Sequence, residues 1–258
     1  MAARPAVAGH ETVLSQATGL RSFERWLAHA PLARAYPWLT SVPGALLLNT
    51  PAYKLHEELQ LRPDNRVLDV GAGRGSLLKL LASHVAFVKP PVSIDTSRAL
   101  LLLDDTTSAQ RVQSGPSSLP FADASFDVVT CAHVLHRLDD DAFLDLLKEM
   151  RRVLTHGGIA VVWDFAPTRS ATLNAWNRRV LSARPGEVNL RTYTTLSAYA
   201  LEAGFEWVNN AHLRPFLAPP IPRISLILGK APVGWTTDVP AVNEAIKQMH
   251  PEPAGHTH

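Results

Sequence analysis

The chain has 258 residues, of which 46% are hydrophobic and 19% charged, a composition that excludes disordered and fibrous proteins. The formal net charge of +2 offers no electrostatic basis for binding nucleic acid, so we expect a small-molecule substrate and no nucleic-acid partner. A single cysteine, Cys131, excludes an internal disulfide framework and suits a reducing compartment.

No apolar run reaches the length of a membrane span, and the first residues do not resemble a secretory signal. We therefore expect a cytoplasmic protein. His256 and His258 lie near each other but have no neighbouring cysteine or acid, so no metal site is expected. The oligomeric state is not readable from the sequence, and a homodimer is one of the open alternatives.

Residues 1–53 are expected to form a cap segment over one end of the main domain, which spans residues 54–232. From Leu20 to Tyr53 the chain combines five aromatic residues with four prolines. Prolines at such intervals allow only short helices. A helix is predicted from Lys54 to Leu61, before the turn at Pro63-Asp64.

Strand and helix patterns alternate from residue 66 to residue 165. The predicted strands are Arg66–Val70, Val92–Ile94, Arg111–Gln113, Asp127–Cys131 and Ile159–Phe165, and the predicted helices span residues 76–83, 97–103 and 140–153. His156-Gly157-Gly158 is expected to end the last of these helices. Such alternation predicts an α/β fold with a parallel sheet and right-handed crossovers.

The polar stretch after Pro167 is predicted to contain a lid helix around Trp176–Arg179, although a solvated charged face would explain its arginines equally well. Next come a helix over 195–203 that ends at Gly204, and two closing strands over 206–213 and 224–228. Residues 233–258 are expected to form a flexible tail.

The most informative stretch is V-L-D-V-G-A-G-R-G, residues 67–75, in which an apolar strand leads into three glycines. Glycine permits positive φ and removes the Cβ atoms that would keep a ligand from the main chain. The N–H groups that open the following helix attract an anion. The loop predicts a cradle for a nucleotide-type cofactor, the alternative being a tight turn without a ligand.

Asp95 ends the second predicted strand, 26 positions after Asp69. That offset is close to the one at which nucleotide-binding α/β domains place the acid that binds ribose hydroxyls. The alternative is that Asp95 caps the helix that follows it.

His133 and His136 follow the fourth strand, at the carboxyl edge where ligands bind in such sheets. A histidine in this place can accept a proton during catalysis, so both are candidate catalytic residues. The alternative is that both rings only pack or bind the backbone. Trp163-Asp164-Phe165 is expected to form a wall of the substrate pocket, and Cys131 is expected to be a small buried residue.

The acidic residue and G-x-G-x-G at 69–75 resemble the first motif of the class I S-adenosylmethionine (SAM)-dependent methyltransferases. L-P-F-A-D-A-S-F-D at 119–127 resembles a run of the methyltransferase type 11 subgroup, which includes the ubiquinone/menaquinone C-methyltransferases. V-L-H-R at 134–137 is similar to the V-L-H-H run of that subgroup. The resemblance implies a Rossmann-like, mostly parallel seven-stranded sheet with helices on both faces and an antiparallel last hairpin.

The resemblance also implies SAM as the cofactor, with Asp69 near the amino group of its methionine part. The candidate cofactor-binding residues are Asp69, Gly71, Ala72, Gly73, Gly75, Asp95, Thr96, Ser117, Ser118, Leu119, Cys131 and Ala132. The subgroup has an acidic residue for the adenine amino group shortly before the L-P-F run, where this chain has Gly115-Pro116. Adenine is therefore expected to be held by backbone groups and serine hydroxyls.

The predicted function is transfer of a methyl group from SAM to a small, hydrophobic molecule by direct displacement. Two alternatives remain. One is a catalytically inactive SAM-binding scaffold, which the absent adenine acid motivates. The other is a nicotinamide-dependent Rossmann oxidoreductase, which the spacing of the glycines disfavours, because Ser76 stands where a dinucleotide fingerprint would continue.

Overall fold

The computed structural model describes residues 59–103, 109–181, 188–211 and 222–234. The expected cap segment 1–53, residues 54–58 of the predicted first helix and residues 235–258 of the expected tail lie outside the described residues. The sequence predicted a helix that reaches Leu61, but residues 59–61 are not helical. The chain turns there, and Gln60 has a φ of 47°.

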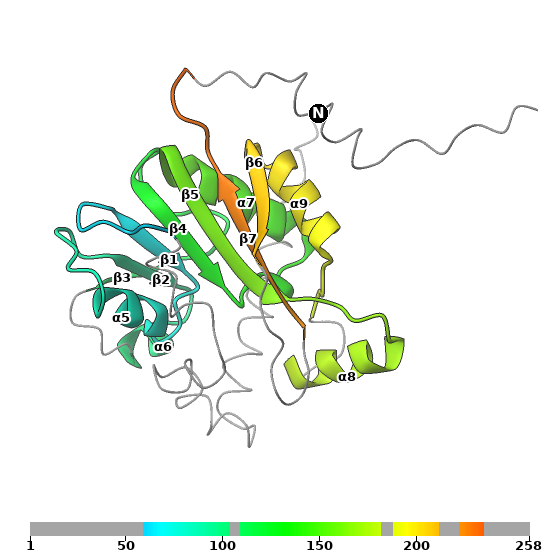
Figure 1. Cartoon of the computed structure of the whole chain (residues 1–258). Coiled ribbons are helices and arrows are strands. Elements are labelled where there is room, and N and C mark those ends of the chain that lie inside the picture. The colour runs from blue at the N-terminus through cyan, green and yellow to red at the C-terminus, as the bar shows by residue number, and fades with distance from the viewer. Residues whose placement is uncertain (1–58, 104–108, 182–187, 212–221, 235–258) are drawn as a thin grey trace, which may run out of the picture.

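A single seven-stranded sheet, in the order β3-β2-β1-β4-β5-β7-β6, forms the centre of the described molecule (Figure 1). Its strands are β1 (Val67–Val70), β2 (Val92–Asp95), β3 (Gln110–Gln113), β4 (Phe126–Ala132), β5 (Leu154–Phe165), β6 (Trp207–Ala211) and β7 (Arg223–Gly229). Strands β1 to β5 pair in parallel, and β7 runs antiparallel to both β5 and β6. The predicted mostly parallel sheet with an antiparallel last hairpin is confirmed.

The helices of the described ranges are α5 (Ser76–Ala82), α6 (Arg98–Leu103), α7 (Asp140–Val153), α8 (Ala171–Leu181) and α9 (Tyr193–Glu202), with a 3₁₀ turn, η3 (Leu135–Arg137), after β4. Helix α7 has the predicted bounds, because the side chain of Asp139 accepts a hydrogen bond from the Ala142 N–H and caps its first turn. Thr192 caps α9 in the same way, so that helix begins two residues before the predicted start. None of these helices is long and apolar enough to cross a bilayer.

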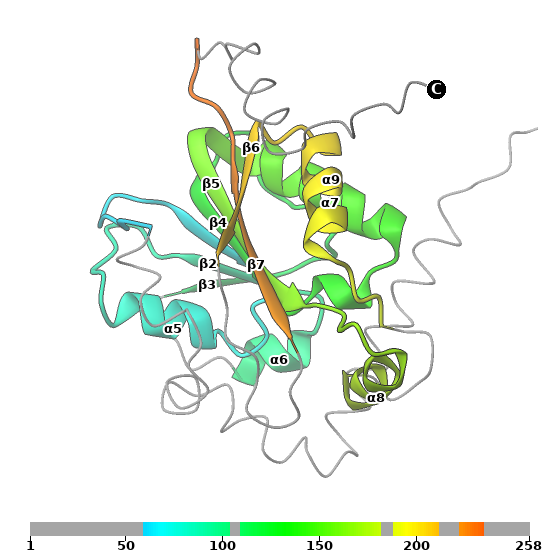
Figure 2. The ribbon, with the colours of Figure 1, turned by 45° about the vertical axis from the view of Figure 1, so that its right-hand side comes forward.

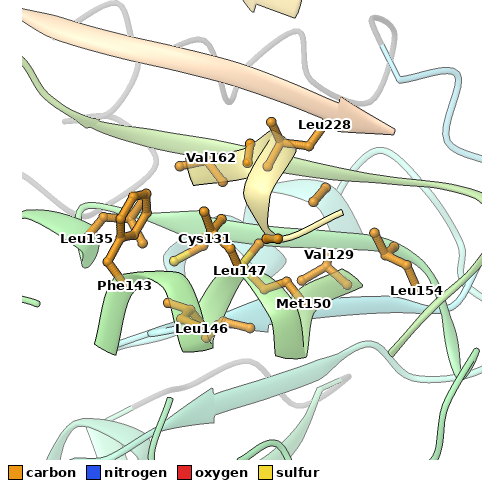
Figure 3. Close-up of a cluster of buried hydrophobic side chains, with 14 of the residues drawn as sticks. Val129, Cys131, Leu135, Phe143, Leu146, Leu147, Met150, Leu154, Val162 and Leu228 are labelled. Carbon is orange, nitrogen blue, oxygen red and sulfur yellow. The ribbon is translucent and has the colours of Figure 1, made fainter. Parts of the chain in front are cut away.

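Helices cover both faces of the sheet: α5 and α6 lie on one side, and α7 and α9 on the other (Figures 1 and 2). Strand β5, between β4 and β7, contributes side chains to the cores on both faces, because successive side chains of a strand point to opposite faces. Ala160 and Val162 pack with the α7 side, whereas Val161 and Trp163 pack with the α5 side. Figure 3 shows the larger cluster, in which α7 lays Phe143 and its apolar neighbours on β4 and β5.

Strand β5 begins at Leu154, five residues earlier than predicted, and Gly157-Gly158 lies within it instead of ending α7. The backbone of Gly157-Gly158 exchanges hydrogen bonds with Lys230, and a Cβ at Gly158 would come 2.9 Å from the Asp127 carbonyl oxygen. These glycines therefore allow β5 to lie close to the backbone of Lys230 and Asp127. Lys230 provides hydrogen bonds for carbonyl groups at the end of α7, because its Nζ donates to the Arg151 and Leu154 carbonyls.

Candidate active site

The carboxyl ends of β2, β1, β4 and β5 meet at one edge of the sheet and bring the predicted site residues together. Asp69 of β1 is level with Thr130 of β4, and the Gly71 N–H donates to the Ile94 carbonyl of β2 at 2.8 Å. On the other side the His133 N–H donates to the Trp163 carbonyl of β5 at 2.8 Å. The parallel register therefore places the glycines, Asp95 and the histidines along one edge.

Residues 71–75, called here the glycine loop, turn from β1 into α5. Its three glycines have φ values of 72°, 57° and 70°, which lie in the left-handed region that other residues avoid. A Cβ on Gly71 would come 2.2 Å from the Cγ2 of Val134. The first glycine is thus required by a neighbouring side chain as well as by the turn, which the sequence did not reveal.

Asp95 fastens the end of β2 to the glycine loop. Its Oδ2 accepts the Gly73 N–H at 2.9 Å, and its Oδ1 accepts the Ser97 N–H at 2.8 Å, next to the start of α6. The side chain that caps α6 is that of Ser97, whose hydroxyl accepts the Leu100 N–H at 3.3 Å, so Asp95 positions the capping residue and is not itself the cap. A carboxylate has about four acceptor sites, so amide binding is compatible with binding a ribose hydroxyl. Thr96 lies half-buried beside it.

Three further candidate residues lie on the strands next to the glycine loop, Asp69 on β1 and Cys131 and Ala132 on β4. Asp69 is 2% exposed and accepts the Thr130 hydroxyl at 2.7 Å. Cys131 is fully buried, and burial raises the pKa of its thiol well above the ordinary value, so it stays a neutral core residue as expected. Ala132 is half-buried.

The L-P-F segment is held on α7 by a charged pair that sequence reasoning missed. Glu149 accepts the Leu119 N–H at 2.7 Å, and Arg152 donates to the Leu119 carbonyl at 2.9 Å and to the Phe121 carbonyl at 2.8 Å. The Leu119 amide is therefore already bonded within the chain, whereas Ser117 and Ser118 are exposed. The feature of the sequence that could have revealed this pair is the i, i+3 spacing of Glu149 and Arg152 on a predicted helix.

His133 begins the segment of residues 133–139 between β4 and α7, called here the histidine loop. Its φ is 58°, an uncommon value for a residue other than glycine and one that often marks a functional site. Its ring stacks on Phe165 with centroids 4.8 Å apart. Burial lowers the pKa of His133 to about 4, against the opposing effect of Asp164.

His136 is bound at two points by Asp164, the penultimate residue of β5. Its backbone N–H donates to Oδ2 at 2.6 Å, and its ring Nδ1 lies 2.7 Å from Oδ1. Burial lowers the pKa of the imidazole, so it is neutral at neutral pH. The other ring nitrogen, Nε2, is buried and has no hydrogen-bond partner in the described ranges.

Asp164 is the main residue of the site whose role the sequence did not predict, since it was expected only in a pocket wall. It is 2% exposed and also accepts the Phe165 N–H at 2.7 Å. Burial alone would raise the pKa of this carboxyl, but the neighbouring histidines and the N–H donors bring it below the ordinary value. Because Asp164 accepts two backbone N–H groups, those of His136 and Phe165, we interpret the pair as an ionised Asp164 beside a neutral His136.

Residues 188–191, called here the clamp segment, hold the histidine loop from the outside. Asn189 donates its N–H to the His136 carbonyl at 2.7 Å and its side-chain amide to the Leu138 carbonyl at 3.0 Å. Arg191, 6% exposed, donates to the Leu135 and Leu138 carbonyls and to Asp140. Nothing near these residues in the sequence signalled this role.

Residues 176–179 lie on a helix, α8, which lies beyond the carboxyl end of β5 in both views (Figures 1 and 2). Trp176 is 56% exposed, whereas Asn177 is completely buried, and its amide atoms have no hydrogen-bond partner among the described residues.

Comparison with known proteins shows which family this chain resembles. Residues 68–162 match the methyltransferase domain family. The ubiquinone/menaquinone biosynthesis C-methyltransferase UbiE of Ectopseudomonas mendocina is 38% identical over 114 residues, covering 41% of this chain and 44% of that protein. The demethylmenaquinone methyltransferase of Mycolicibacterium vanbaalenii is 30% identical over 159 residues, covering 61% of this chain and 68% of that protein.

Among solved structures, the phosphoethanolamine N-methyltransferase 2 of Haemonchus contortus in complex with SAM superposes with a TM-score of 0.55. It is 14% identical, and the match covers 70% of this chain and 56% of that one, which establishes likeness of fold alone. The chain spans about half the length of several of the curated relatives it matches.

Proposed function

This chain belongs to the class I SAM-dependent methyltransferases, in the subgroup of the ubiquinone/menaquinone C-methyltransferases, and from that premise we propose that it methylates a small, hydrophobic molecule. SAM is its cofactor. The observation that carries the proposal is the joining of the glycine loop to Asp95 at one edge of the sheet. The names of the curated relatives, which concern quinone biosynthesis, support a hydrophobic substrate.

The residues of this edge fit the cofactor. The backbone of the glycine loop carries no Cβ at three positions, and Asp95 is within reach of the same loop through the Gly73 amide. Arg74, between the second and third glycines, has a buried Nε without a hydrogen-bond partner in the described residues. A carboxylate such as that of the methionine part would supply the missing acceptor. We assign the twelve candidate cofactor-binding residues to this role.

When bound, SAM supplies an electrophilic methyl group. The chain's own contribution is to align the acceptor, to exclude water and to take up a proton where the acceptor carries one. His133 and His136 are our candidates for the last role, because both rings contact the end of β5: His133 stacks on Phe165, and His136 is bonded to Asp164. Helix α8 is proposed to be a lid over the acceptor. Residues 1–53 are proposed to be a cap segment over one end of the main domain. We further propose a cytoplasmic location and a homodimer, which analytical ultracentrifugation would test.

Calorimetry with SAM, S-adenosylhomocysteine and NAD tests the cofactor. We expect both adenosyl compounds to bind and NAD not to bind; binding of NAD alone would overturn the proposal. Transfer is tested with methyl-labelled SAM and demethylmenaquinone, short-chain hydroquinones or simple phenols as acceptors. SAM binding without transfer to these acceptors or to a metabolite extract would identify a scaffold instead of an enzyme.

A further inference from the structure

We propose that His136 is the catalytic base, that Asp164 is its positioning residue, and that the acceptor is an apolar molecule presenting one acidic O–H or C–H to the Nε2 of His136. This inference rests on the proposed methyl transfer and makes its acceptor more specific. It follows from three observations: the two-point binding of His136, the unpartnered Nε2 and the clamp on the histidine loop.

The contacts of Asp164 determine which nitrogen carries the proton. An ionised carboxylate only accepts hydrogen bonds, so the Nδ1 that lies 2.7 Å from Oδ1 must be the protonated nitrogen. In a neutral imidazole the lone pair then belongs to Nε2. The second bond, from the His136 N–H at 2.6 Å, prevents the residue from turning away from Asp164.

If His136 had only a structural role, its Nε2 would be expected to have a hydrogen-bond partner. A buried polar atom without a hydrogen-bond partner destabilises the folded protein, and such atoms are rare in folded proteins. Nε2 is buried and has no partner in the described part of the chain. The Phe165 ring contacts the imidazole at an interplanar angle of 74°, with 5.1 Å between centroids. A ligand hydroxyl or acidic carbon would supply the missing donor.

The surroundings also select the kind of acceptor. His136 is 2% exposed, so the group it deprotonates must itself be held away from water, as an apolar molecule is. A neutral imidazole is a weak base, which suits phenols, enols and activated carbon acids better than alcohols. The charged groups that act on the ring are Asp164, Arg137 and Arg191.

The transfer step is then balanced. The acceptor O–H or C–H bond breaks, and its proton forms a bond to Nε2. The electron pair left on the acceptor forms the new bond to the methyl carbon. The bond between that carbon and sulfur breaks with its pair kept on sulfur, which leaves S-adenosylhomocysteine. Asp164 stays ionised and stabilises the imidazolium that results.

The direct test reads the tautomer in the unmodified protein by long-range ¹H–¹⁵N correlation on ¹⁵N-histidine-labelled chain, with His136→Gln used for assignment. We expect a neutral ring protonated at Nδ1 at pH 7. A ring protonated at Nε2, or a doubly protonated ring, would overturn the proposal. This result does not depend on SAM binding, so it separates failure of the inference from failure of the proposed function.

The kinetic test compares His136→Gln with His156→Gln, an exposed histidine of β5 outside the site. With a phenolic acceptor, His136→Gln should lower kcat at least about 100-fold while SAM affinity stays within about threefold. The deficit should shrink as the pH rises above the acceptor's own pKa, because an acceptor that is already ionised needs no base. A deficit that stays constant with pH, or unchanged activity, would overturn the role of His136.

Asp164→Asn tests the positioning role. An amide can donate to Nδ1, so we expect the proton to move toward Nε2 and kcat to fall by a similar factor, with SAM affinity unchanged. Asp141→Asn, an exposed carboxylate of α7, is the matched control and should alter neither quantity. If Asp164→Asn does not fold, the tautomer of the unmodified protein still decides. A folded Asp164→Asn with an unchanged tautomer and unchanged kcat would refute the positioning role.

Discussion

The glycine loop and the histidine loop lie side by side at the edge of the sheet, yet they are held in place by different means. The glycine loop is shaped mainly by its own sequence, since three glycines adopt positive φ and one carboxylate 22 residues away fastens it. The histidine loop is held from a distance, by Asp164 on β5 and by the clamp segment more than 50 residues away. A locally encoded turn can be recognised from sequence, whereas a loop held by distant contacts cannot.

The two loops meet at Gly71 and Val134, and this contact gives the largest predicted effect. Gly71→Ala should destabilise the protein by about 3–5 kcal/mol, from the left-handed backbone and from overpacking against Val134. Urea unfolding measures it. Gly234→Ala is the control, because Gly234 also has positive φ but has no atom within 4 Å of an added Cβ.

If both alanine variants lose the same stability, the contact between the loops contributes nothing. Combining Gly71→Ala with Val134→Ala should recover part of the loss, because the truncated side chain frees the space that the new Cβ needs. No recovery would assign the whole loss to the backbone of Gly71.

The clamp segment gives the next effect. Arg191→Met should destabilise the protein by about 2–4 kcal/mol, because it removes bonds to two buried carbonyls and to Asp140 and a contact over the Phe143 ring at 4.6 Å. It should also speed hydrogen exchange of the His136 amide but not of the Gly73 amide. Equal acceleration at both amides would mean that the two loops are not held independently.

Arg62→Met is the control for this change. Arg62 pairs with Asp64 at 3.1 Å, but both side chains are about 70% exposed, so we expect a loss below about 1 kcal/mol. A loss comparable with that of Arg191→Met would show that burial does not explain the importance of the clamp.

Asp95 allows a test of whether the glycine loop is only anchored by this carboxylate or also binds ribose through it. Asp95→Ala should weaken SAM binding by about 10- to 100-fold, the range expected for one or two lost hydrogen bonds to a charged acceptor. Calorimetry with S-adenosylhomocysteine and its 2′-deoxy and 3′-deoxy analogues separates the two roles. If Asp95 binds ribose, the variant no longer distinguishes these ligands; if it only anchors Gly73, the distinction survives in weakened form.

The free energy of unfolding should also depend on pH, through the two histidines of the histidine loop. The pKa values of His133 and His136 lie below the ordinary 6.5, so the unfolded chain binds more protons as the pH falls. Their contribution to the free energy of unfolding is complete above pH 6.5. It should decline from there toward pH 4 by at most about 1.4 kcal/mol per pH unit for each histidine.

The groups that modulate this pH effect are Asp164, which opposes it, and three arginines, Arg137, Arg191 and Arg223, which enhance it. Urea unfolding from pH 7.5 to pH 4.5 measures it. His136→Gln should flatten the profile, and His156→Gln should not. A profile that is already flat in the unmodified protein would mean that folding does not lower the pKa values of the two rings.

Sequence by itself determined the fold class, the cofactor class and the bounds of α7, because each depends on short-range patterns. Glycine spacing and the alternation of strand and helix patterns are readable within short windows of the sequence. The start of β5 was misplaced because Gly157-Gly158 was interpreted as a helix stop, when its role is a close approach to Lys230 and Asp127.

Tertiary structure alone decided how the site is held together. Asp164 meets His136 only because β4 and β5 are neighbours in the sheet, and Arg191 reaches the same loop only after the chain has passed through α8. Neither residue stands at a distinctive spacing from its partner in the sequence. A parallel sheet aligns the ends of strands that are remote along the chain, and that alignment turns a strand-end carboxylate and a loop histidine into a pair.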